Sequence, residues 1–377
     1  MAKAKYTCGS DGYYQTKVWD GTYNDDGTKH RITLRSSKSS RDLENQVNNL
    51  KAKVESRSNI VPAKHDVWTY ANEWLSTFKA NKSLNTIKMY DRIITNHMDA
   101  FKGVTFSALS VRHIQAAVTA VYDRPRTCQQ LIVTLKQVVK SAIRERYLPA
   151  GTLDDLFDGI DTPKYQPGEK RALTPAEKDA IFSAGFTLKQ KAFVYTLYYT
   201  GIRRGEALAL TRDDINVTEK YVNIDKSIAF NDNTGFVKDP KSYNGFRHIP
   251  MPEPYLSFMI EYLPQLTGPY LFSMGNGEIM SKSSFNKFWK QIFRQINLAA
   301  GGTDDLTVLY DLTPHVFRHN YCTEMCYQVP AISFNTIAEW LGDTKAMVVE
   351  VYSHAMSEKE NVNEILKKVF GDSKRSS

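Results

Sequence analysis

The spacing of hydrophobic residues divides the chain into three segments. In the first, residues 13–19 and 29–35 alternate between polar and apolar positions, which predicts two strands. Asp20-Gly21 and Asp26-Gly27 are turn signals. A polar helix is predicted from about residue 40 to residue 55, with apolar residues on one side: Leu43, Val47 and Leu50. Residues 1–62 are therefore expected to form a small sheet backed by one helix.

Apolar residues recur at helical spacing through the second segment, residues 63–165. Four helices are predicted, beginning near Val67, Ile87, Ser110 and Thr127. The last extends to Tyr147 and carries three basic residues, four apart, on one face: Lys136, Lys140 and Arg144. Residues 149–167 are rich in Gly, Pro and Asp, and they are predicted to be the hinge that ends this helical domain.

The third segment, residues 172–377, mixes helical and strand spacing. Thr174-Pro175-Ala176-Glu177 combines a capping threonine, a proline and an acid, which predicts a helix start. Residues 192–199 are apolar nearly all round and predict a central helix. Residues 221–230 and 246–251 predict strands joined through the hairpin signal Asn244-Gly245. Further helices are predicted near residues 283–298, 314–327, 335–341 and 358–370.

Composition narrows the class of protein. With 377 residues, the chain is long enough for two or three domains, and 42% hydrophobic with 24% charged residues is typical of a soluble protein. No apolar run approaches the roughly 18 residues of a membrane span, and the polar start predicts no secretory signal. Cys322 and Cys326 lie four apart in a predicted helix. We interpret them as packed thiols of a reducing cytoplasm and not as a zinc site.

The positive charge lies in the first two segments. The net charge is +8, but residues 1–60 hold 11 basic and 7 acidic residues, residues 61–170 hold 15 and 11, and residues 171–377 hold 23 of each. A positive front and a neutral back indicate that the front holds a polyanion. Basic residues share one strand face of the first segment: Lys17, Arg31 and Arg35. This face and the helical stripe each fit either contact with DNA or simple solvation.

The third segment also holds residues that can bind and attack a phosphodiester. Gly201 is expected to end the helix before it, so that Arg203 opens a new helix with Glu206 placed to brace it. His315 and Arg318 are likewise three apart on one helix face. A guanidinium is a planar fork that matches phosphate oxygens, so two forks from separate elements can clamp one phosphate.

Four motifs of this segment resemble those of the tyrosine recombinases, the phage and conjugative-transposon integrases. The motifs are Thr200-Gly201-Ile202-Arg203-x-Gly205-Glu206, Lys241-x-x-x-Gly245-x-Arg247-x-Ile249-Pro250, Thr313-Pro314-His315-x-x-Arg318-His319, and Leu341-Gly342 followed by Tyr352-Ser353-His354. The resemblance implies a multidomain α+β fold. Its expected parts are an arm-type DNA-binding domain (1–62), an all-helical core-binding domain (63–165) and a mainly α catalytic domain with a small antiparallel sheet (172–377).

The resemblance also implies catalytic residues at the matched positions: Arg203, Lys241, His315, Arg318, Asp343 and Tyr352. Tyr352 is implied to attack the scissile phosphate and form a 3′-phosphotyrosyl link, while the two arginines hold the non-bridging oxygens. His315 is implied to act as base and phosphate contact. Lys241 is implied to protonate the 5′-oxygen leaving group, with Lys238 as the competing candidate. The covalent link conserves the energy of the broken bond, so no metal, ATP or other cofactor is implied.

One position departs from the family's pattern. Asp343 stands nine residues before Tyr352, where the family usually has histidine or sometimes tryptophan. Histidine there donates a hydrogen bond to a phosphate oxygen, whereas an ionised aspartate cannot donate and repels the phosphate. Three interpretations are open: Asp343 is turned away or holds another active-site group, it is protonated, or the activity is reduced. We favour the first, because this position is the least chemically demanding of the set.

The implied function is site-specific recombination that integrates and excises a mobile element. The implied partners are double-stranded DNA with core and arm-type sites and a homo-tetramer on that DNA, with no membrane. The implied location is the cytoplasm, for a bacterial or phage-encoded protein that acts on nucleoid DNA. Excisionase and DNA-bending proteins stay open as further partners. The predicted helix at residues 358–370 either docks on a neighbouring protomer or packs on its own domain. Two functions compete: a type IB topoisomerase, and a DNA-binding regulator with an inactive catalytic domain, which Asp343 alone favours.

Overall fold

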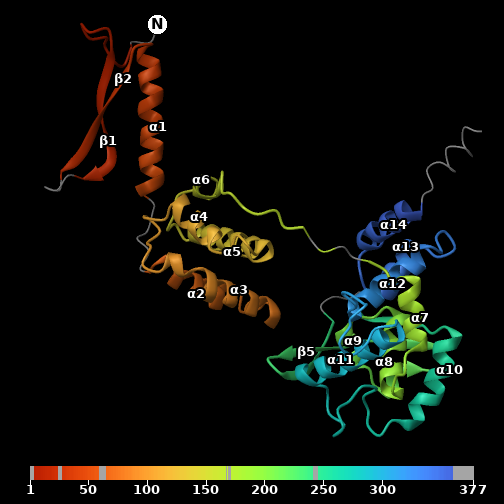
Figure 1. Ribbon diagram of the computed structural model, residues 1–377. Coiled ribbons are helices and arrows are strands. Elements are labelled where there is room, and N and C mark those ends of the chain that lie inside the picture. The colour runs from red at the N-terminus through yellow and green to blue at the C-terminus, as the bar shows by residue number, and fades with distance from the viewer. Residues whose placement is uncertain are drawn as a thin grey trace, which may run out of the picture. The chain divides into compact units, whose positions relative to one another are not determined.

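The computed structural model describes residues 4–23, 28–58, 65–166, 168, 171–240 and 245–359 (Figure 1). The chain forms two compact units, Met1–Pro167 and Gly168–Ser377. Helices predominate in both units, and the sheets are small and antiparallel, which confirms the predicted mixed class. Within the described part of the chain, no helix is long and apolar enough to cross a membrane.

A two-stranded sheet and one helix form the N-terminal part of the first unit. They are β1 (Tyr14–Tyr23), β2 (Lys29–Ser36) and α1 (Ser40–Ser58). The strands run antiparallel with Val18 opposite Ile32, and α1 packs against both strands with Leu43 buried. Because side chains alternate along a strand, the residues on the other face remain exposed: Lys17, Arg31 and Arg35.

The predicted turn at Asp20-Gly21 is wrong, since both residues lie within β1. The pairing of the two strands shifts register between Trp19 and Tyr23. The glycine therefore marks an irregularity in the strand and not a reversal of the chain. The second predicted turn, Asp26-Gly27, lies outside the described residues.

Helices α2 to α6 enclose the core of the helical region. They are α2 (Val67–Phe78), α3 (Leu84–His97), α4 (Val111–Thr119), α5 (Pro125–Arg144) and α6 (Thr152–Phe157), with a short 3-10 turn at Asp99–Phe101. Trp74 and Tyr90 meet edge to face in this core, with ring centroids 5.2 Å apart. The hinge predicted at residues 149–167 is wrong in its first part, because α6 adds Leu156 to the core. Asp154 and Asp155 favour this helix, since they lie in its positively polarised first turn.

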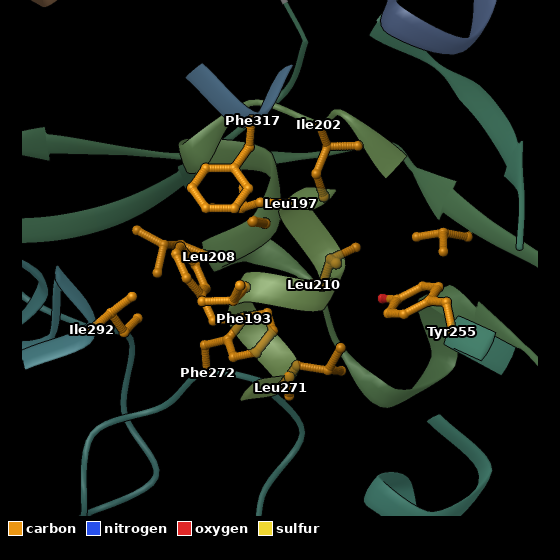
Figure 2. Close-up of a cluster of buried hydrophobic side chains, with 14 of the residues drawn as sticks. Phe193, Leu197, Ile202, Leu208, Leu210, Tyr255, Leu271, Phe272, Ile292 and Phe317 are labelled. Atoms are coloured by element: carbon orange, nitrogen blue, oxygen red, sulfur yellow. The ribbon is translucent and has the colours of Figure 1, made fainter. Parts of the chain in front are cut away.

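The second unit is built around helix α8. Its helices are α7 (Pro175–Ser183), α8 (Leu188–Thr200), α9 (Arg204–Ala209), α10 (Glu253–Tyr262), α11 (Lys282–Ala299), α12 (Pro314–Cys326), α13 (Phe334–Leu341) and α14 (Lys345–Lys359), with 3-10 turns at Arg212–Asp214 and Leu263–Gln265. Figure 2 shows Phe193 and Leu197 of α8 among the buried side chains of this core, and Phe272 meets Phe193 edge to face at 5.0 Å. The all-round apolar sequence of α8 thus reflects a central position, as predicted.

Two small antiparallel sheets flank this core. The strands β3 (Ile215–Asn216), β4 (Tyr221–Ile224) and β7 (Arg247–Pro250) form one sheet, and β5 (Ser227–Asn231) pairs with β6 (Thr234–Lys238). The single strand predicted at residues 221–230 is therefore two strands, interrupted where Lys226 bonds Asp214. Strand β7 pairs with β4 across the intervening β5–β6 hairpin. The predicted short hairpin connection is therefore wrong, because β5 and β6 lie between the paired strands β4 and β7 in sequence. Asn244 lies outside the described residues.

Helices α12, α13 and α14 enclose a second, smaller core that holds Tyr321, Ile337 and Val348. The predicted helices near residues 314–327 and 335–341 correspond to α12 and α13. The sequence pattern predicts neither α10 nor α14, because apolar residues are scattered around both helices. In α14, for instance, Val348 is buried while Val349 is exposed. The helix predicted at residues 358–370 lies outside the described residues from residue 360 onward.

Candidate active site

Gly201 makes the turn that presents the first arginine. It ends α8 in the left-handed conformation, with φ +61°, and an added Cβ would lie 2.6 Å from the Tyr321 ring. The chain restarts at once, so that Arg203 becomes the N-cap of α9. The helix break predicted at Gly201 is therefore confirmed.

The Arg203 guanidinium is 43% exposed and faces three acceptors. It donates to Glu206 Oε1 at 3.1 Å and to the Gly342 carbonyl at 3.0 Å, and it lies 3.4 Å from Asp343 Oδ2. The backbone N–H of Arg203 also donates to Glu206 Oε2 at 2.8 Å. Glu206 thus braces Arg203 as predicted, and the exposed part of the guanidinium is open to a ligand from solvent.

Arg318 comes from α12, and its side chain is only 6% exposed. Its Nη1 donates to the Gly201 carbonyl at 3.1 Å, and its Nη2 donates to Asp343 Oδ2 at 2.9 Å. Arg203 and Arg318 both lie against Asp343 Oδ2, and burial together with the nearby charge of Arg203 lowers the pKa of Arg318. The structure therefore brings together two guanidiniums that lie over a hundred residues apart in sequence.

A third arginine, Arg247 on β7, shares the Glu206 carboxylate with Arg203. Its side chain is 1% exposed and donates to Glu206 Oε2 at 2.7 Å and to the Trp340 carbonyl at 2.7 Å. Burial alone would raise the pKa of the Glu206 carboxyl, but Arg247 and then Arg203 hold it below its ordinary value. No role of Arg247 is predicted from sequence beyond its place in the second motif. Its alternation with the buried Ile249 was the available signal, since both face inward from β7.

Asp343 is not turned away from the arginines. Its Oδ2 accepts from Arg318 and lies near Arg203, while its Oδ1 accepts from the Thr344 N–H at 3.0 Å. Burial alone would raise the pKa of this carboxyl, but the Arg318 hydrogen bond, the Thr344 N–H and both positive charges lower it. Of the open interpretations, this geometry agrees with an Asp343 that holds another active-site group, and it gives no support to a protonated one.

A small pocket lies beside these side chains. Its lining includes His315, Arg318, His319, Cys322 and Asp343, so the predicted base lies in the same pocket as the second arginine. The thiols of Cys322 and Cys326 are free and buried. The hydrogen bond with Cys326, together with burial, raises the pKa of Cys322, which keeps this thiol neutral next to the arginines.

Among the contacts of the described residues, none joins Tyr352 to Arg203 or Arg318. The tyrosine lies on α14, where its half-buried ring meets the Phe334 ring edge to face at 4.9 Å. Val348 and Val351 of the same helix line the pocket that holds His315, whereas Tyr352 does not. The nucleophile predicted from sequence therefore lies on α14 next to the pocket-lining Val351, with its ring packed on Phe334. Lys241 lies outside the described residues, and the competing Lys238 ends β6.

Comparison with known proteins identifies the family. A family model described as the phage integrase family matches residues 171–359, which is half of the chain. The chain belongs to the phage integrase family. Its relatives are tyrosine recombinases: XerA of Pyrococcus furiosus is 24% identical over 276 residues, covering 72% of this chain and 84% of the relative. XerD of Staphylococcus epidermidis (strain RP62A) is 24% identical over 307 residues, covering 76% and 94%.

Solved structures share the fold of this integrase-family chain. The Tn1549 transposon integrase in complex with a circular intermediate DNA has a TM-score of 0.65 at 17% identity, covering 78% of this chain and 99% of that one. A lambda integrase tetramer bound to a Holliday junction has a TM-score of 0.57 at 15% identity, covering 92% and 93%. The family places this protein among the tyrosine-type site-specific recombinases.

The residues predicted to bind DNA are exposed in both N-terminal regions. Lys17, Arg31 and Arg35 share one face of the β1–β2 sheet, and Arg35 donates to Gln15 at 3.1 Å. On α5 the predicted stripe is uneven. All three residues are exposed, but the Lys136 ammonium lies 5.3 Å from the Phe157 ring centroid, near the acidic residues of α6. In this integrase-family protein, no carboxylate among the described residues pairs with Lys140 or Arg144, while Lys136 already packs on an aromatic ring.

Proposed function

We propose that this recombinase cuts and rejoins double-stranded DNA through a 3′-phosphotyrosyl intermediate, and so integrates and excises a mobile element. One observation carries the proposal: Arg203 and Arg318 converge on a single carboxylate oxygen, Asp343 Oδ2. Guanidinium forks bind carboxylate and phosphate oxygens with the same geometry. A place that holds one anionic oxygen between two forks is therefore suited to a non-bridging phosphate oxygen.

The proposed reaction assigns each bond change to a side chain. The Tyr352 oxygen attacks phosphorus and its proton passes to His315, while the two arginines stabilise the charge that builds on the non-bridging oxygens. The bond to the 5′-oxygen breaks, and Lys241 supplies the proton to this leaving group. Attack by a 5′-hydroxyl on the phosphotyrosyl bond reverses these steps and rejoins the strand.

This reaction requires the Tyr352 ring to leave Phe334 and reach the phosphate held by the arginines. The contact to be given up is the edge-to-face packing on Phe334, and such an aromatic pair is worth only about 0.5–1.5 kcal/mol. DNA binding and assembly can supply that amount. We propose assembly as a homo-tetramer on two duplexes, supported by the fold shared with the lambda integrase that was solved as a tetramer on a Holliday junction.

Covalent capture on DNA tests the proposal. The substrate is a nicked suicide duplex that carries the joined ends of the element encoding this chain, and the readout is a protein–DNA band on a denaturing gel. The wild type should give the band, and Tyr352→Phe should abolish it while retaining DNA binding, because only the attacking oxygen is removed. Tyr310→Phe is the matched control, since Tyr310 is 71% exposed and outside the site. A band that persists in Tyr352→Phe would show that another residue is the nucleophile.

A DNA-binding regulator with an inactive catalytic domain is the second candidate. Asp343 favours it, because a carboxylate already occupies both arginines. The same gel separates the two functions. A wild-type protein that binds the joined ends in a mobility-shift assay but never forms the covalent band is a regulator.

A further inference from the structure

The Asp343 carboxylate accepts from two guanidiniums and a backbone N–H, which are donors that also bind phosphate oxygens. Gly342 ends α13 in the left-handed conformation, with φ +59°, and turns the chain toward the arginines. Asp343 then presents Oδ2 to Arg318 at 2.9 Å and to Arg203 at 3.4 Å, while Oδ1 accepts from the Thr344 N–H at 3.0 Å. Both oxygens of the carboxylate therefore accept from donors, and two of the three donors are guanidiniums.

The same N–H groups cannot serve Asp343 and a phosphate at once. Two anions within contact distance would also repel each other strongly in a partly buried site. If a phosphodiester is clamped by Arg203 and Arg318, Asp343 must therefore move. The alternative is a permanent ion pair that only stabilises the fold, as Glu206 does for Arg247.

We propose that Asp343 is a removable occupant of the phosphate site, which holds Arg203 and Arg318 in position until a phosphodiester displaces it. That the displacing group belongs to DNA rests on the proposed function; the occupancy rests on the distances alone. Asp343 is thus a positioning residue for the two arginines. Its place in the fold suits exchange, because its side chain is 30% exposed, compared with 8% for Glu206.

Displacement of Asp343 also affects the helix that carries the nucleophile. Asp343 lies two residues before α14, which begins at Lys345 and contains Tyr352. Breaking the hydrogen bond to Arg318 removes the contact between that arginine and the segment that leads into α14. Phosphate binding and the release of Tyr352 from Phe334 are in this way connected through one short segment of chain.

Anion binding to the full-length protein without DNA tests the proposal. The probe is sulfate, titrated against chloride at constant ionic strength, and the readout is the midpoint of thermal unfolding. The Asp343→Asn protein should bind sulfate about tenfold more tightly than wild type, because the competing charge is gone. Arg203→Gln added to Asp343→Asn should remove this gain, since one fork is lost.

The matched control is Asp214→Asn. Asp214 is also a buried carboxylate paired with a cation, 2.7 Å from Lys226 Nζ, but no described contact joins it to the arginines. Its sulfate response should equal that of wild type. Equal sulfate responses in wild type, Asp343→Asn and Asp214→Asn would overturn the proposal, because Asp343 would then not compete with an anion.

If Asp343→Asn does not fold, wild-type crystals soaked with orthovanadate give the answer. Vanadate between Arg203 and Arg318, with the Asp343 side chain turned aside, supports the proposal. Asp343 still bonded to Arg318, with vanadate elsewhere or not bound, contradicts it. Both measurements are made without DNA cleavage, so a failure of Tyr352 to form an adduct would leave their result unaffected.

Discussion

Two sets of basic side chains in this protein differ in burial and in their partners. The α5 set, Lys140 and Arg144 with Lys136, is exposed, and no described carboxylate pairs with it. The site set, Arg247 and Arg318, is 1% and 6% exposed, and each guanidinium is bound to a carboxylate. The first set is regularly spaced along one helix, whereas the two members of the second come from separate elements, β7 and α12.

The two sets differ in how much the free energy of unfolding depends on each charge. An exposed cation is screened by water and salt, so it contributes little to the fold and mainly attracts anions at long range. A buried cation loses its hydration and is tolerated only while its partner is present. The site set is therefore coupled to folding, and the α5 set is not.

The largest effect is expected when a buried partner is removed. Glu206→Gln leaves Arg247 buried without its counter-ion and loosens the brace on Arg203. The free energy of unfolding should fall by about 3–5 kcal/mol, measured by urea denaturation. The control is Asp304→Asn, which removes the exposed partner of Arg294 and should leave stability almost unchanged. Equal losses in the two variants would erase the distinction between buried and exposed pairs.

An intermediate effect is expected from pH, through Asp343. Its folded-state pKa lies below the ordinary value of 3.8, so its ion pair stabilises the fold above that value, and the contribution is lost as pH falls through the folded-state pKa. Near neutral pH, Asp343→Asn should be about 1–2 kcal/mol less stable than wild type. The difference should begin to shrink as pH falls below 3.8 and vanish below the folded-state pKa, measured by denaturation across pH. A difference independent of pH would mean that the amide disturbs packing and not charge.

Local relations in the site could be predicted from sequence, and long-range ones could not. The break at Gly201 and the Glu206 brace involve residues within five positions of one another, where glycine conformation and helix spacing are informative. The Arg318–Asp343 contact depends on how α12 meets the end of α13, which no local pattern encodes. The contacts of Tyr352 are equally unpredictable from sequence, because apolar residues are scattered around α14 and define no single face. Motif resemblance placed Tyr352 in the reaction, but only packing shows that it rests on Phe334.

The smallest effects are expected on α5, where they separate one stripe residue from another. Lys140→Gln should weaken binding to a non-specific duplex and lower the slope of log affinity against log salt by about 1, as for one lost phosphate contact. Lys136→Gln should change the slope less, because its ammonium already packs on Phe157 beside acidic residues of α6. Fluorescence anisotropy over a salt series measures both slopes, and the unfolding midpoints should match wild type. Equal slope changes would show that α6 does not shield Lys136, and no change in either would remove the stripe from the DNA-binding surface.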